Sequence, residues 1–203
     1  MRRLTRKTVA PAVAFLALLA FACNRGPAES ALASADQELA AVRADLERYA
    51  PAELAALDDA VAKARAAVAE GHYTDALRAA QALPERIRAA AEAATASKQR
   101  LTGTWDELSP ALAASLQAIA DRATALAGAS SLPRGLTPDA FAAARAELDA
   151  VTREWNEAHA AVQGGDVPKA LQLAGDVKAR AEALAGTLGL APPPAAPATA
   201  PPR

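Results

Sequence analysis

The chain has 203 residues, which suits one domain or two small ones, and an aromatic content of 3% excludes a thick core of large side chains. Residues 1–22 hold four of its 22 basic residues and none of its 23 acidic residues, so the remainder carries 18 − 23 = −5 charges. This balance argues against a nucleic-acid-binding protein, which needs a basic surface, and against simple electrostatic docking onto anionic lipid.

The composition predicts an all-α fold. Alanine, the strongest helix former, is the commonest residue, and we find no alternation of β-branched and aromatic residues that would indicate a strand. We expect antiparallel helical hairpins in an elongated bundle of about six helices. The predicted segments are a signal peptide (1–22), a lipid-anchored tether (23–30), a helical region with the first hairpin (31–127), a linker (128–137), a second helical hairpin (138–190) and a disordered tail rich in Pro and Ala (191–203).

The N-terminal segment has the order of an export signal. Arg2, Arg3, Arg6 and Lys7 precede an apolar stretch at 9–22 that is shorter than the roughly 20 residues of a membrane-spanning helix. The paired arginines also permit twin-arginine export, but the Phe and Leu that should follow the pair are missing. We therefore predict a cleaved signal peptide of the general secretory type.

Cys23 is the only cysteine, so it cannot form an internal disulfide. The preceding residues LLAFA resemble a bacterial lipoprotein signal, in which cleavage before the Cys leads to its lipidation; Ala20 and Phe21 depart from the usual Leu and small residue. The resemblance implies a lipid anchor at Cys23 in the bacterial cell envelope, facing the periplasm. In such lipoproteins Asp after the Cys favours the inner membrane, so Asn24 favours the outer membrane. The alternatives are a secreted protein or an uncleaved anchor with an incidental Cys.

The first three predicted helices follow from apolar residues spaced three and four apart. One helix should span about residues 28–48. The next should start at Pro51, a residue favoured in a first helical turn, and end at Gly71, a typical C-terminal glycine. A long third helix is predicted from Tyr73 to Leu108, with a kink near Pro84.

The remaining helices are predicted from caps and glycines. Ser109-Pro110 resembles a cap and first-turn Pro, so a fourth helix should start there and end before the loop at 128–137. Thr137-Pro138 should cap the fifth helix, and Gly164-Gly165 should form the turn to the sixth.

An internal repeat links the two hairpin turns. Residues 71–77 (GHYTDAL) and 165–171 (GDVPKAL) share Gly, Ala and Leu at the same spacing, so we assign Pro51, Gly71, Tyr73 and Gly165 structural roles at the turns. The pattern resembles the inter-helix turn of tetratricopeptide repeats, although Ala80 stands where an aromatic residue is usual. Residues 23–94 as a whole resemble Ala-rich helical domains of unknown function in bacterial envelope lipoproteins. The resemblance rests on the order of Cys23, an Ala-rich helix, residues 49–54 (YAPAEL) and residues 71–73 (GHY), and it implies export, lipidation and a helical hairpin, but no activity.

The sequence offers no catalytic constellation, so we expect a protein that is not an enzyme and has no cofactor. The two histidines, His72 and His159, are too few for a metal site. Adjacent carboxylates, as in Asp58-Asp59 and Asp106-Glu107, point in different directions on a helix. The serines lack the context of a hydrolase nucleophile.

Trp105 and Trp155 are the most distinctive side chains. They serve either as anchors of helix seams or as residues that bind a partner. The favoured function is a non-catalytic, lipid-anchored scaffold or adaptor that binds an unidentified envelope protein, with self-association as another way to cover the apolar stripes. The alternative is a periplasmic carrier that binds a lipid or small molecule between the hairpins.

Overall fold

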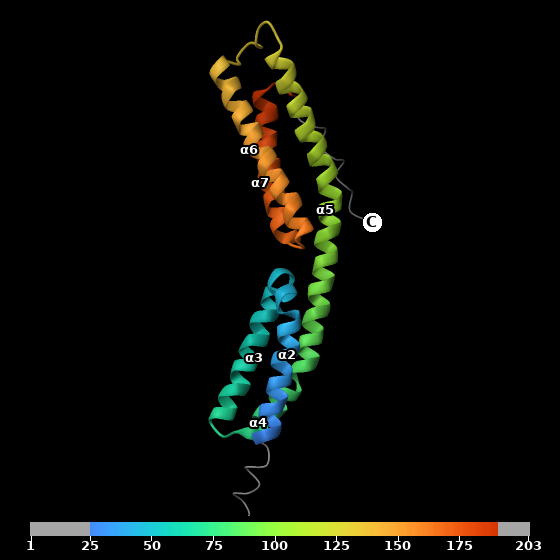
Figure 1. The fold of residues 1–203 in the computed structure, drawn as a ribbon, viewed down its shortest axis with the longest axis vertical. Coiled ribbons are helices and arrows are strands. Elements are labelled where there is room, and N and C mark those ends of the chain that lie inside the picture. The colour runs from blue at the N-terminus through green and yellow to red at the C-terminus, as the bar shows by residue number, and fades with distance from the viewer. Residues whose placement is uncertain (1–24, 191–203) are drawn as a thin grey trace, which may run out of the picture. The chain divides into compact units, whose positions relative to one another are not determined.

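The computed structural model describes residues 25–190, which form α-helices joined by turns and contain no strand (Figure 1). The all-α prediction is confirmed. The chain divides into two compact units, unit 1 (Met1–Ser97) and unit 2 (Lys98–Arg203), and the division falls within a helix rather than at the loop 128–137. The helices are α2 (Arg25–Tyr49), α3 (Pro51–Ala69), α4 (Tyr73–Gln81), α5 (Leu83–Ala127), α6 (Pro138–Gln163) and α7 (Val167–Thr187).

In unit 1, α2, α3 and α4 pack against one another through small and aliphatic side chains. The predicted stripes supply the core: Leu39 and Leu46 of α2 and Leu57 of α3 are at most 2% exposed. Burying a Leu side chain contributes about 1.5–3 kcal/mol, so a few leucines hold each seam. Ala76 and Ala80 on α4 are also buried, and their short side chains let α4 lie close to its neighbours.

The turn between α3 and α4 is a Schellman motif. The His72 amide donates to the Ala67 carbonyl (2.8 Å) and the Gly71 amide to the Val68 carbonyl (3.1 Å). Gly71 has a φ of 82°, which a residue without a Cβ adopts at little cost. Tyr73 then begins α4, and Pro51 begins α3 with Ala50 as the single residue between α2 and α3.

The predicted long third helix, with a kink at Pro84, is wrong. Instead α4 ends at Gln81 and a new helix, α5, starts at Leu83. Pro84 becomes the second residue of α5. An N–H in the first turn has no acceptor within the helix, so the N–H that Pro lacks costs no hydrogen bond there. Leu83 is 1% exposed, so the break also turns an apolar side chain into the core of unit 1.

The predicted helix boundary at Ser109-Pro110 is also wrong, because α5 continues through Pro110 as one helix of 45 residues. An interior Pro costs about 3 kcal/mol through the lost hydrogen bond and a steric clash. The stripe on both sides of it is buried, including Trp105, Leu112 and Ile119, each at most 5% exposed. Because each such side chain contributes about 1.5–3 kcal/mol, burial of the continuous stripe outweighs the local cost.

In unit 2, the second part of α5 lies with the hairpin of α6 and α7 (Figure 1). The core holds Val151 of α6 and Ala174 and Val177 of α7, all 0% exposed. The Arg122 guanidinium on α5 donates to the Leu188 carbonyl after α7 (3.1 Å), which joins the first helix of the unit to its last.

The turn between α6 and α7 repeats the geometry of the turn in unit 1. The Asp166 amide donates to the Ala161 carbonyl (2.8 Å), the Gly165 amide donates to the Val162 carbonyl (2.9 Å), and Gly165 has a φ of 73°. The same hydrogen bonds and positive φ occur at Gly71. The sequence repeat therefore corresponds to a repeated backbone structure.

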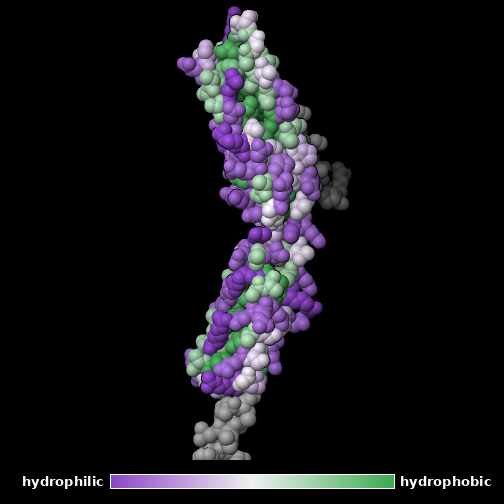
Figure 2. Space-filling model, in the orientation of Figure 1, coloured by the Kyte–Doolittle hydropathy of each residue, from purple (hydrophilic) through white to green (hydrophobic). Residues whose placement is uncertain are grey.

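Most of the visible surface of each unit is hydrophilic. Figure 2 shows hydrophobic residues mainly as narrow strips between helices in each unit, while charged and polar side chains cover much of the helix surface. Within residues 25–190, no helix is both long and apolar enough to cross a membrane.

Candidate functional site

Trp105 and Trp155 form a stacked pair between α5 and α6. Their ring centroids are 5.3 Å apart and their planes meet at 22°, a geometry that contributes about 0.5–1.5 kcal/mol beyond area burial. Trp105 is 5% exposed and Trp155 is 8% exposed, so the pair fills the seam of unit 2. Little of either ring is accessible from outside in this conformation.

His159 covers the outer side of the tryptophan pair. Its imidazole is nearly perpendicular to both indoles, at 4.6 Å from the centroid of Trp155 and 5.3 Å from that of Trp105. Unlike them, His159 is exposed. The cluster does not follow from the sequence pattern alone, although Trp155 and His159, four residues apart on one helix, share a face.

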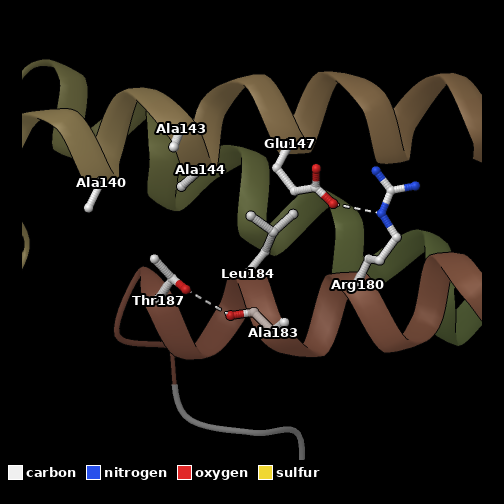
Figure 3. Close-up of a pocket in the computed structure, with 8 residues that line it drawn as sticks. All are labelled: Ala140, Ala143, Ala144, Glu147, Arg180, Ala183, Leu184 and Thr187. Carbon is white, nitrogen blue, oxygen red and sulfur yellow. Dashed lines mark hydrogen bonds and ion pairs between the residues drawn. The ribbon is translucent and has the colours of Figure 1, made fainter.

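Arg180 on α7 binds two carboxylates of α6. Its Nε lies 2.6 Å from Glu147 Oε1, and its Nη1 pairs with Glu154 Oε2 (Figure 3 shows the pair with Glu147). The hydrogen bond from Arg180 holds the pKa of Glu147 below its usual value, while the carboxylate raises the pKa of Arg180. Because the two glutamates lie two helical turns apart, one guanidinium fixes the register of the hairpin.

A hollow of about 440 Å³ lies between α6 and α7 beside Arg180 and is open to solvent. Figure 3 shows the short side chains of Ala140, Ala143 and Ala144 facing Leu184 and Thr187 across it. The Thr187 hydroxyl donates to the Ala183 carbonyl (3.0 Å). Ligand sites normally enclose 70–90% of a bound molecule, which an open groove lined by alanine does not do.

Unit 1 has a smaller groove of about 270 Å³ between α3 and α5. It lies beside Leu57 and Ala90, and the Arg86 guanidinium reaches across it to the Ala56 carbonyl (3.3 Å). The rest of its lining is Glu53, Ala56 and Ala89, and its one arginine is already hydrogen-bonded to the protein.

Two ion pairs of unit 1 join α2 to α3. Arg43 donates two hydrogen bonds to Asp58, at 2.5 and 3.1 Å, and Arg65 pairs with Asp36 at 2.5 Å. The bonds from Arg43 hold the pKa of Asp58 below its usual value. Asp59, next to Asp58, instead binds Lys63 at 2.7 Å, so the two neighbouring carboxylates have different partners.

The histidines and acidic residues do not converge on a common point. His72 lies in the turn of unit 1, with its Nδ1 3.5 Å from Glu70, while His159 belongs to unit 2. Within the part of the chain that the structure describes, no group of three His, Cys, Asp or Glu side chains has the geometry to hold a metal ion.

Three sequence predictions concern residues outside the described range, namely the signal peptide at 1–22, the lipid anchor at Cys23 and the tail at 191–203. The predicted tether at 23–30 is wrong in its described part, because α2 already begins at Arg25 and includes Gly26 and Pro27 in its first turn, where a Pro is tolerated. The assignment of Trp105 and Trp155 to partner binding stays a prediction, as does the resemblance to lipoprotein helical domains. The chain matches no protein-family model, no curated protein and no solved structure.

Proposed function

We propose that this protein is a lipid-anchored, non-catalytic component of a bacterial cell envelope, whose helical hairpins bind another envelope protein. The observation that carries the proposal is the position of Cys23, the only cysteine, directly after a basic and then apolar segment. Two acyl chains on such a residue would give a stable anchor, since each buried methylene contributes about 0.8 kcal/mol.

The hairpins support the scaffold part of the proposal. Each unit contains a helix pair closed by the same Schellman turn, and ion pairs join α2 to α3 in unit 1 and α6 to α7 in unit 2. Such units present several helix faces in a fixed register. The arginines at the two grooves, Arg86 and Arg180, bind protein atoms, which suits a structural part better than a reactive one.

Replacing Cys23 tests the anchor. The Cys23→Ser variant should lose lipid incorporation and move from the membrane fraction to the soluble fraction of the envelope. Fractionation and mass spectrometry of the N-terminal peptide would measure both effects.

Ser34→Ala, an exposed substitution in α2, serves as the matched control and should leave the protein in the membrane fraction. The anchor proposal fails if Cys23→Ser protein stays membrane-bound, or if the wild-type N-terminal peptide carries no lipid.

Site-specific crosslinking tests partner binding. A photoreactive amino acid at Ala143, in the α6–α7 groove, or at Ala89, in the α3–α5 groove, should give a discrete adduct in native membranes. The same probe at Ala129, in the exposed loop, is the matched control and should not give that adduct.

The adduct's composition separates the possible occupants. A band with a second protein supports the scaffold, and a band that joins tagged to untagged copies of this chain indicates self-association instead. Crosslinks to lipid alone from the groove positions would favour a carrier. Identical patterns from Ala143, Ala89 and Ala129 would contradict a defined binding surface.

A further inference from the structure

We draw no further inference here: the strongest candidate, the open hollow between α6 and α7 lined by Ala143, Ala144, Leu184 and Thr187, carries nothing because no feature of residues 25–190 shows what covers it.

Discussion

The two hairpin turns have the same backbone but different side-chain support. At Gly71 and at Gly165 the same two amides satisfy the last carbonyls of the preceding helix. The helix that follows is capped differently: the Asp166 carboxylate accepts from the Lys169 amide at 3.2 Å, whereas His72 gives α4 no side-chain cap.

The contacts between helices also differ between the two units in the side chains that make them. Unit 1 relies on leucines and on two separate ion pairs between α2 and α3, while unit 2 adds a tryptophan stack and a single arginine shared by two glutamates. The turn geometry is thus set by the glycine and backbone hydrogen bonds. The stability of each unit depends in addition on the side chains that pack and pair between its helices.

The largest expected effect comes from the tryptophan stack. Trp155→Ala should lower the free energy of unfolding by about 3–5 kcal/mol, because a large buried side chain is replaced by a cavity. Amide hydrogen exchange should accelerate mainly in α6 and α7. Urea unfolding followed by circular dichroism measures the total loss.

Two variants make this comparison specific. Asn156→Ala, next to Trp155 but exposed, should change stability by no more than about 0.5 kcal/mol. Leu46→Ala in unit 1 should cost about 2–5 kcal/mol and accelerate exchange mainly in α2 and α3. Equal acceleration in both units after either core substitution would show that the units do not respond separately.

Replacing either turn glycine should have the next largest effect. Gly71→Ala and Gly165→Ala should each cost about 1–2 kcal/mol, since an L-residue is disfavoured at positive φ. At Gly71 the added methyl group meets no atom within 4 Å, so backbone strain is the only cost there. Thermal and urea unfolding measure both losses.

Gly103→Ala is the matched control. Gly103 lies inside α5, with no atom within 4 Å of an added Cβ and no positive φ, so Ala should stabilise the helix by up to about 1 kcal/mol. A destabilised Gly103→Ala variant, or Gly71→Ala as stable as wild type, would refute the conformational explanation.

Exchanging the cap residues tests the difference between the turns. Asp166→His should cost about 1 kcal/mol through loss of the cap, and His72→Asp should gain about 0.5 kcal/mol. The gain is smaller than the loss because Glu70 and Asp75 already place carboxylates near position 72. Urea unfolding measures both changes in the free energy of unfolding. If the two changes had the same sign, the explanation by side-chain capping would be wrong.

The smallest expected effect is the acid dependence of the ion pairs. Asp58 and Glu147 have lowered pKa values when folded, so the unfolded state binds more protons as the pH falls. Their stabilisation is complete above the unfolded pKa values, near 4, and is lost as the pH falls through the lower folded values. Asp58→Asn should cost about 0.2–1 kcal/mol at pH 7 and flatten the acid slope.

Glu147→Gln should flatten the slope for unit 2 in the same way, measured by urea unfolding between pH 2 and 7. Asp45→Asn, an exposed change on α2, controls for the loss of one negative charge. A slope unchanged by both Asp58→Asn and Glu147→Gln would mean that neither pair contributes to stability.

Local sequence patterns were enough to predict the helical hairpins but not all helix boundaries. Pro51 and Gly71 act through the backbone of their own turn, so their positions could be placed from the sequence. The local pattern predicts a kink at Pro84 and a helix start at Pro110, yet Pro84 lies at a helix start and Pro110 lies inside the helix. Burial of the stripe around Pro110 decides this, and that burial depends on helices far away in the chain.

The tryptophan cluster shows the same limit. Trp105 and Trp155 were each placed on an apolar stripe, but the stack depends on how far α5 is shifted along α6. No short-range spacing encodes that register. The ion pairs of Arg180 could likewise not be predicted, because their acidic partners lie 26 and 33 residues earlier in the chain.

The segregation of aromatic residues gives unit 2 an optical signal of its own. Both tryptophans lie in unit 2, and both tyrosines, Tyr49 and Tyr73, lie in unit 1. Indole emission excited near the red edge of its absorption, where phenol does not absorb, therefore reports unit 2 alone, while far-ultraviolet circular dichroism reports the helices of both units. The unmodified protein can thus show, in one titration, whether its two units melt together or in sequence.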